Sequence, residues 1–442
     1  MQSRRRGGGY SRRVTRPSDD EPPRGLVRRW RWVVLAVALV VAALKFCIAS
    51  STSGTNDVYN FQAFANQIRQ LGPIGIYGHR LVIGKQIYPP YNHPPPIGWL
   101  LVGINHLTDA GLSFRFLIRA PAVLADIVTS MLVFELVRMQ RTVRDATIAG
   151  IAIALCPALI IVSGFHGNTD PVFVMFATLS MFLLVRDRSA ALAGLSFGVA
   201  ISVKIVPVVV LPVLLLTAAR SGRRRLIEFV AGGGAVFVLL WVPVLLRRFT
   251  EFDKNVIGFR GYNKPLWGLP EFASLAGVSN HWLVAGSGPI LMLVLSAGLP
   301  LLVAWRRPDA AIRAFGLALV LVMLLSTATG TRYLVWACAA AFLVDVWAGL
   351  VFNIGASYFM TVVYDRWNDH SYPWDWNRAH AADWTHHEVA IGVVVWVALL
   401  AVAIIGLLPR RGRGPAAGPD PAVAAPEADD TASPTSPTAR FS

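Results

Sequence analysis

Carboxylates that can accept a proton and cations that can hold an anion stand at a few isolated points of this apolar sequence. The first is Asp57, which follows the first long apolar run and has Asn56 and Tyr59, both able to hydrogen-bond, close by. A carboxylate there is stable in water but costly to bury without a partner. Asp57 is therefore either a functional group or the cap of the helix that follows.

A second polar segment, residues 163–171, lies between two apolar runs and holds His166, Asn168 and Asp170. Its small residues, and the proline directly after Asp170, are typical of a tight turn that starts the next helix. The same three polar side chains at a membrane edge are also suited to line a polar cavity. The spacing alone leaves both interpretations open.

Lys204 and Arg332 are isolated cations. Lys204 lies inside a long apolar stretch, where an ionisable group indicates a functional site with an anionic partner. The alternative is a side chain that snorkels to the outer interface. Arg332 precedes Tyr333 and Trp336 at an expected helix start, where a cation opposes the helix dipole and an anion would stabilise it. Alternatively, these residues anchor the helix at the interface.

Two further segments are rich in aromatic residues. Residues 88–96 hold His93 among tyrosines and prolines, and residues 364–388 hold four tryptophans among aspartates and histidines. Aromatic rings with carboxylates suit a carbohydrate, but they also suit an interfacial belt. The histidines at 386–387 do not form an H-E-x-x-H motif and the three cysteines form no C-x-x-C pair, so we predict no metal site; a divalent metal stays possible but unsupported.

The elements that position these residues are expected to be membrane-spanning helices. Of the 442 residues, 55% are hydrophobic and only 15% are charged, against roughly 25% in a soluble chain. Since a span needs ~20 apolar residues, we predict an all-α polytopic membrane protein with about 12 transmembrane helices. The apolar runs are 32–50, 116–137, 146–164, 171–185, 189–204, 206–219, 227–246, 286–305, 310–327, 333–346, 348–363 and 389–408.

The positions of the arginines indicate which ends of these runs face the cytoplasm. Arginines follow five of the six even-numbered runs, so we interpret the net charge of +16 as positive-inside topology rather than as nucleic-acid binding. Arg247 and Arg248, after the seventh run, are the exception. We predict a multi-pass protein of the plasma (inner) membrane with both termini cytoplasmic. The predicted extracytoplasmic segments are 51–115, 164–170, 247–285 and 364–388.

The orientation depends on residues 94–108, which are apolar but short and begin with three prolines. We predict a re-entrant or interface-lying helix there; a span would invert the arginine pattern. Residues 1–31, with ten arginines, and residues 409–442 are predicted to be disordered cytoplasmic tails. Between them lies one transmembrane domain, residues 32–408.

These segments together resemble the GT-C superfamily, the integral membrane glycosyltransferases that use polyprenyl-phosphate sugars. The resemblance runs from Trp32 to about Trp336. The sequence is most similar to actinobacterial polyprenol-phosphate-mannose-dependent mannosyltransferases of phosphatidylinositol mannoside and lipoglycan synthesis. The residues that carry it are Asn56-Asp57-Val58-Tyr59, the Gly-Ile-Tyr and Tyr-Pro-Pro-Tyr-Asn-His-Pro-Pro segments, Gly-Phe-His-Gly-Asn-Thr-Asp, the apolar hairpin around Lys204, and Thr331-Arg332-Tyr333.

The resemblance implies a GT-C fold and an inverting transfer of a sugar, mannose, to a glycolipid or lipoglycan hydroxyl on the outer face. It implies that Asp57 is the general base, that Lys204 and Arg332 lie near the carrier phosphate, and that Asp170 is a second polar group of the site. The other implied substrate-binding residues are His93, His166, Asn168 and Tyr59.

The chemistry agrees with these roles. A sugar phosphate has an anionic leaving group that fixed cations stabilise, and an attacking hydroxyl needs a base. One carboxylate with two cations suffices for single-displacement inversion. The expected partners are membrane lipids, the polyprenyl-phosphate donor and the acceptor, with no nucleic acid, no certain cofactor, and a monomeric protein.

Other functions stay open at this point. Within the superfamily, an arabinofuranosyl transferase or a protein O-mannosyl transferase would have the same features. A lipid or solute transporter is the alternative of a different class. Transporters tend to show paired repeats and midplane charges, whereas the ionisable residues here gather at one face, which favours the enzyme.

Overall fold

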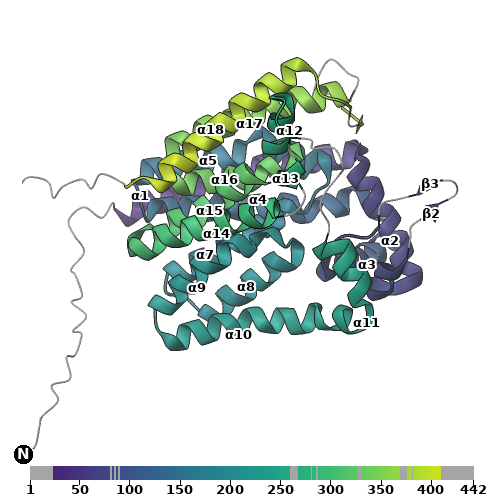
Figure 1. Ribbon diagram of the computed structural model, residues 1–442, viewed down its shortest axis with the longest axis horizontal. Helices are drawn as coiled ribbons and strands as arrows, with labels where there is room; N and C mark the ends of the chain where they lie inside the picture. The colour runs from purple at the N-terminus through teal and green to yellow at the C-terminus, as the bar shows by residue number, and fades with distance from the viewer. Residues whose placement is uncertain are drawn as a thin grey trace, which may run out of the picture. The chain divides into compact units, whose positions relative to one another are not determined.

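The computed structural model describes most of the chain (Figure 1). The described residues are 23–79, 82–83, 86–87, 90–258, 267–279, 281–284, 287–326, 330–368, 376–380 and 382–409. The chain divides into two units, Met1–Leu407 and Leu408–Ser442. Almost all of the second unit lies outside the described residues, as does most of the predicted N-terminal tail.

Helices make up nearly all of the described part of the first unit, and each predicted apolar run falls on one helix or on consecutive helices. Seven helices among the described residues are long and apolar enough to cross a membrane. They are α1 (Arg24–Ser51), α4 (Phe114–Arg138), α5 (Val143–Leu155) continued by α6 (Pro157–Ile160) and η2 (Ile161–His166), α14 (Gly288–Arg306), η5 (Pro308–Ala310) with α15 (Ala311–Leu325), α17 (Val346–Trp367) and α18 (His386–Leu407).

The remaining runs form a bent helix pair and shorter helices. The pair, bent by 66°, consists of α10 (Arg223–Leu240) and α11 (Val242–Phe252) with η4 (Asp253–Ile257). The shorter apolar helices are α7 (Asp170–Val185), α8 (Ala190–Val203), η3 (Val206–Val210) with α9 (Leu211–Arg220), and η6 (Thr331–Leu334) with α16 (Val335–Val344). The predicted all-α polytopic membrane fold is confirmed, but the described residues hold seven helices of spanning length and apolarity, or eight with the bent pair, rather than about 12. The difference arises because four of the predicted apolar runs form helices of only 10–17 residues.

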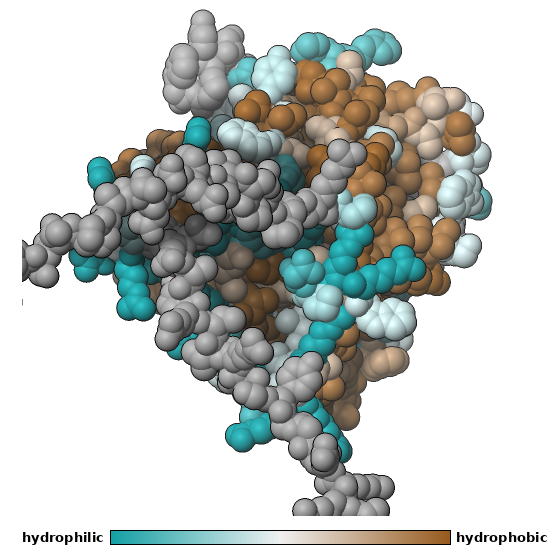
Figure 2. All heavy atoms as spheres, turned by 90° about the vertical axis from the view of Figure 1, so that its left-hand side faces the viewer, coloured by the Kyte–Doolittle hydropathy of each residue, from teal (hydrophilic) through white to brown (hydrophobic). Residues whose placement is uncertain are grey.

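Burial separates inner helices from outer ones. All ten residues of α16 are buried, whereas α1, α14 and α18 leave large apolar side chains such as Val40, Val294 and Val394 exposed. Apolar side chains facing outward are expected where the surrounding solvent is lipid. Figure 2 shows hydrophobic side chains gathered over a broad part of one face.

The segment between α1 and α4 is largely helical, and none of its described helices is both long and apolar enough to cross a membrane. It consists of α2 (Asn56–Gly75), η1 (Ile76–Gly78), the short strands β2 (Val82–Ile83) and β3 (Gln86–Ile87), and α3 (Pro95–Asp109). α3 begins at prolines, which are favoured in a first helical turn, and its 15 residues are fewer than a span needs. It packs on α2, where Asn105 donates to the Ala65 carbonyl at 2.7 Å. The predicted short helix at 94–108 is confirmed.

The first helix starts earlier than predicted. α1 begins at Arg24, so residues 24–31 are helical and do not belong to a disordered tail. Arginine is a good helix former, and Arg31 pairs with Glu135 of α4, which gives this polar turn a tertiary partner. The sequence shows no apolar face there, and for this reason it does not predict the extra turns.

Charged contacts join the helix ends that the arginine pattern assigned to one face. Glu135, near the end of α4, binds Arg31 before the apolar part of α1 and Arg186 after α7, the latter at 3.2 Å. Arg141, after α4, binds Asp345 after α16 at 2.8 Å. The start of the first run and the ends of the second, fourth and tenth runs therefore lie together. The compartment that this face meets stays a prediction.

A short parallel strand pair links two segments far apart in the sequence. β1 (Gly54–Thr55) pairs with β4 (Arg378–Ala379), so the segment after α17 lies beside the start of α2. Gly54 has φ +82°, and a Cβ there would lie 2.6 Å from the Phe165 carbonyl oxygen, so only glycine fits. Arg119 of α4 donates to the Ala49 carbonyl at 2.8 Å and thereby holds the end of α1. The remaining short helices are α12 (Leu269–Leu275) and α13 (His281–Val284).

Candidate active site

A cavity of about 380 Å³ collects most of the predicted site residues. They come from α2, the segment before α3, the α7 start, the α8 end and η6, and all lie at the helix ends opposite the Glu135 contacts. Its volume is in the range of small-molecule sites. The predicted residues that line it are Asp57, His93, Asn168, Asp170, Lys204 and Arg332.

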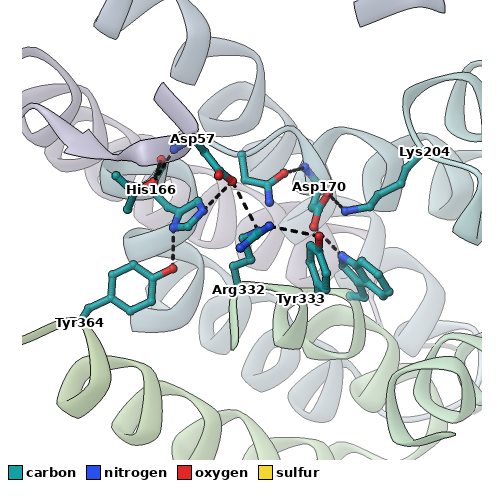
Figure 3. Close-up of polar contacts among 10 residues, drawn as sticks. Asp57, His166, Asp170, Lys204, Arg332, Tyr333 and Tyr364 are labelled. Atoms are coloured by element: carbon teal, nitrogen blue, oxygen red, sulfur yellow. Dashed lines mark hydrogen bonds and ion pairs between the residues drawn. The ribbon is translucent and has the colours of Figure 1, made fainter. Parts of the chain in front are cut away.

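Asp57 reaches into this cavity from the first turn of α2. The cap of that helix is Thr55, whose hydroxyl oxygen accepts a hydrogen bond from the Asp57 backbone N–H at 3.3 Å, so the capping interpretation of Asp57 is wrong. Its carboxylate Oδ2 lies 2.9 Å from Nε2 of His166 and 3.4 Å from Nε of Arg332 (Figure 3). Oδ1 has no hydrogen-bond partner among the described residues, and it is the oxygen left for a ligand.

The surroundings of Asp57 keep it ionised. Burial alone would raise the pKa of this carboxyl, but the charge of Arg332 and the contact with His166 outweigh that effect and hold its pKa well below its usual range. Asp57 is therefore a carboxylate at neutral pH, able to accept a proton. The predicted anionic partner of Arg332 is Asp57 itself, and the guanidinium also lies against the Tyr333 ring at 4.7 Å.

His166 lies behind Asp57, at the end of the π-helix η2. Gly167 ends that helix with φ +84°, and a Cβ there would lie 2.5 Å from a methyl carbon of Val58. The His166 carbonyl accepts a hydrogen bond from the Thr55 hydroxyl at 2.9 Å, which ties the turn to the start of α2. The other ring nitrogen, Nδ1, lies 2.5 Å from the Tyr364 hydroxyl of α17.

Asp170 and Lys204 form the second charged pair of the cavity. Lys204 follows α8 in extended backbone, and its Nζ lies 2.7 Å from Oδ1 of Asp170. Oδ2 of Asp170 accepts a hydrogen bond from Trp336 Nε1 at 2.7 Å. Nζ also lies over the rings of Tyr333, at 4.0 Å, and Trp336, at 4.7 Å. Lys204 therefore has an anionic partner within the protein, and Trp336 is buried.

Polar and aromatic residues form another part of the cavity wall. His93, in the turn before α3, stacks on Phe61 with 4.8 Å between ring centroids. Burial, together with the charge of Lys204, lowers its pKa to about 4, so its imidazole is neutral at pH 7. The amides of Asn60 and Asn92 lie on the same cavity. Neutral donors and acceptors of this kind suit sugar hydroxyls.

Three of the sequence-based expectations concern features outside the cavity: Tyr59, the tryptophan-rich segment and a metal site. Tyr59 does not line the cavity, and its ring lies 4.3 Å from the Arg378 guanidinium carbon. Trp367 and Trp376 are buried among helix ends, so neither belongs to an interfacial belt, while Trp374 lies outside the described residues. Among the described residues, no group of three or more histidine, cysteine, aspartate or glutamate side chains is arranged to hold a metal ion.

Four features of the site were not predicted from the sequence: Asn60, Asn92, Tyr364 and the hydrogen bond from Trp336 to Asp170. Asn60 lies one helical turn after Asp57, at the spacing that places two residues on one helix face, so helical periodicity could have found it. Tyr364 directly follows the eleventh apolar run, at the same membrane face as Asp57 in the predicted topology. No pattern within the neighbouring sequence marks the roles of Asn92 and Trp336.

Comparisons with known proteins agree with this architecture. A family model described as dolichyl-phosphate-mannose-protein mannosyltransferase matches residues 92–246. ArnT from Cupriavidus metallidurans, solved bound to undecaprenyl phosphate, is similar with a TM-score of 0.50 and 18% identity, over 85% of this chain and 71% of that chain. Its apo structure has a TM-score of 0.50 and 17% identity, over 86% of this chain and 72% of that chain.

A weaker likeness is to the oligosaccharyltransferase AglB of Archaeoglobus fulgidus, solved with an inhibitory peptide and a dolichol-phosphate, with a TM-score of 0.39, 12% identity, and coverage of 86% and 55%. No curated protein sequence matched the chain. The likeness to ArnT shows the fold, and the family match supports a GT-C superfamily glycosyltransferase.

Proposed function

We propose that this protein is an inverting glycosyltransferase that moves a sugar, mannose, from a polyprenyl-phosphate donor to a hydroxyl of a glycolipid or lipoglycan on the outer face of the membrane. The observation that carries the proposal is a single cavity that holds one ionised carboxylate, Asp57, and two cations, Arg332 and Lys204. The family match, whose description names dolichyl-phosphate-mannose, supports the donor.

The two walls of the cavity suit the two ends of such a donor. Apolar residues form part of the cavity wall, among them Val206 and Val208, which closely follow Lys204 in the sequence, and Val256 and Leu293. A polyprenyl chain is apolar and would lie along that wall, and its phosphate would then meet Lys204. The sugar would lie toward Asn60 and Asn92, whose amides offer donors and acceptors to hydroxyl groups.

The reaction then follows from the charges. Oδ1 of Asp57 accepts the proton of the acceptor hydroxyl while that oxygen forms a bond to the anomeric carbon. The bond between the anomeric carbon and the phosphate oxygen breaks, and its electron pair leaves with polyprenyl phosphate. Arg332 and Lys204 stabilise the negative charge that grows on the phosphate. Attack from the face opposite the leaving group inverts the anomeric configuration.

Both cations are paired in the structure, and this bears on the mechanism. Asp170 and Trp336 hold Lys204 at one end of the cavity, and Asp57 holds Arg332 at the centre. Fixed cations need little reorganisation when the phosphate arrives, which is how preorganised sites lower a barrier. Asp170 is thus proposed to position Lys204 rather than to react.

A protein hydroxyl is the second candidate acceptor, because the description of the matching family names a protein mannosyltransferase. The donor chemistry and the roles of Asp57, Arg332 and Lys204 would be the same. An arabinofuranosyl donor differs in the sugar alone, and a transporter would bind the lipid phosphate without transfer.

The test is transfer by the purified protein in lipid vesicles. Polyprenyl-phosphate mannose is offered with a glycolipid extract, with a serine- and threonine-containing peptide, or with neither, and polyprenyl-phosphate arabinofuranose replaces it in a parallel set. We expect mannose in the glycolipid product with an anomeric configuration opposite to that of the donor. Retention of configuration would refute the single displacement, and transfer from neither donor would refute the proposed function.

A further inference from the structure

The contacts of Asp57 continue away from the cavity to a tyrosine of another helix. Nε2 of His166 lies 2.9 Å from Oδ2 of Asp57, and Nδ1 of the same ring lies 2.5 Å from the hydroxyl of Tyr364 (Figure 3). His166 and Tyr364 are both buried, and neither lines the cavity. Any part they play in the reaction is therefore exerted through Asp57.

The partners of the two ring nitrogens, Asp57 on one side and Tyr364 on the other, together favour one position for the imidazole proton. An ionised carboxylate only accepts hydrogen bonds, so the 2.9 Å contact requires a proton on Nε2 of His166. Arg332, 3.4 Å from the same carboxylate oxygen, opposes a second positive charge on the ring. A neutral ring with its proton on Nε2 has a bare Nδ1, which accepts the hydroxyl proton of Tyr364.

We propose that Tyr364 is a positioning residue, whose hydroxyl holds His166 as the Nε2–H tautomer and thereby fixes the Asp57 carboxylate with Oδ1 toward the acceptor hydroxyl. This inference rests on the proposed function, in which Asp57 is the base. His166 and Arg332 both lie against Oδ2, so the orientation of the carboxylate is fixed through that oxygen and Oδ1 is left for the ligand. His166 is then a positioning residue rather than a sugar ligand.

Packing explains the tyrosine ring but not its hydroxyl. The ring lies edge-on to Phe165, with 6.4 Å between centroids, and contacts Trp367 at 5.2 Å and Trp376 at 6.2 Å. Phenylalanine would keep each of these contacts. The hydroxyl is the only part of the side chain that reaches Nδ1 of His166, and a buried ring nitrogen without a partner is costly.

The segment after α17 supports this arrangement. Trp376 packs against Tyr364 and donates to Asp365 at 2.9 Å. The next residue, Asn377, accepts a hydrogen bond through its backbone oxygen from Gly54 N–H at 2.8 Å. The same short stretch thus contacts Tyr364 and the strand that leads into Asp57, which are the two ends of the Asp57–His166–Tyr364 contacts. This gives the tryptophan-rich segment a role that the sequence did not predict.

The experiment removes the hydroxyl alone, by Tyr364→Phe. Histidine labelled with ¹⁵N distinguishes a protonated ring nitrogen from a bare one, and the signals of His166 are identified by their loss in His166→Gln. In the unaltered protein we expect Nε2 protonated and Nδ1 bare. In Tyr364→Phe we expect a mixture of tautomers. We also expect kcat to fall about tenfold with an unchanged KM for the donor, in line with the loss of one buried hydrogen bond.

The matched control is Tyr358→Phe, in the same helix, where the tyrosine is 56% exposed. It should leave the His166 signals and kcat unchanged. A proton on Nδ1 of His166 in the unaltered protein would overturn the inference, whether or not the variant folds. So would a Tyr364→Phe protein with the same single tautomer and the same kcat. The NMR signals are recorded without substrate, so they test this inference even if no sugar is transferred and the proposed function fails.

Discussion

Replacing Asp57 with asparagine tests the proposed base most directly. Thr55 rather than Asp57 caps α2, so the start of the helix survives the change. The amide oxygen of asparagine would occupy the place of Oδ2, where it accepts a hydrogen bond from Nε2 of His166 and lies 3.4 Å from Nε of Arg332. Its NH2 group would then lie where Oδ1 faces the cavity. That group donates a hydrogen bond and cannot accept a proton, so the variant is folded but lacks a base.

The expected size of the effect follows from these contacts. A positioned general base contributes about 10²–10⁴-fold, so we expect transfer to fall by roughly 10²-fold or more, which raises the barrier by about 2.7 kcal/mol. The affinity for the donor should not fall with it. Arg332 loses a competing anion 3.4 Å away and is freer to bind the donor phosphate. The KM for the donor should therefore stay equal or decrease.

The assay is the initial rate of transfer in vesicles at varied donor concentration, with the thermal unfolding midpoint measured for each variant. Asp109→Asn is the matched control, because Asp109 is a carboxylate of the same outer segment whose side chain is 57% exposed and pairs with Arg69. Its rate should stay within about twofold of the unaltered protein. A folded Asp57→Asn protein with near-normal kcat would refute the reasoning and make Asp170 the next candidate for the base.

Four further predictions concern the phosphate, the fold, the membrane topology and pH. Lys204→Gln should raise the KM for the donor by about tenfold or more, because the charge-assisted contact with the donor phosphate is lost. The KM for the acceptor should stay unchanged. Donor kinetics equal to those of the unaltered protein would show that Lys204 does not contact the phosphate. Gly54→Ala should lower the thermal midpoint, because Gly54 has a positive φ and the new methyl group would lie 2.6 Å from a backbone oxygen. Gly103→Ala, where the methyl group would meet open space, should leave the midpoint unchanged, and equal midpoints for the two variants would contradict this. A reporter inserted within residues 222–226 should be cytoplasmic, and an outside location would refute the orientation. His93 has a pKa of about 4 in the folded protein, below its ordinary 6.5, so the unfolded chain binds this proton more readily. The stability of the folded protein therefore falls as the pH drops from about 6.5 to 4. His93→Gln should lessen the accompanying fall in the thermal midpoint, and an identical fall would contradict the assignment.

Membrane spans are predictable from sequence because the bilayer imposes a local requirement. Each span must be a helix of ~20 apolar residues with its backbone groups satisfied within the segment, so composition and run length reveal it without knowledge of the neighbours. The same argument makes Lys204 and Arg332 conspicuous, since a cation in an apolar run needs a reason. The order of the runs also predicts which helix ends share a face, and the contacts of Glu135 and Asp345 agree with that order.

The partners of those residues were decided by the tertiary structure. Arg332 pairs with Asp57 and Lys204 with Asp170 because four helix ends from distant parts of the sequence meet at one cavity. No periodicity within one segment encodes such a meeting.

Tyr364 shows the same limit. Its ring looks like any aromatic residue at the end of a span, and its hydroxyl acquires a role only because a π-helical turn places His166 against it. The sequence determines which polar and charged groups cannot face the lipid, because the free energy of placing such a group in lipid depends on the residue and its own helix. The packing of the helices determines which of these groups meet, because that depends on shapes and distances across the whole molecule.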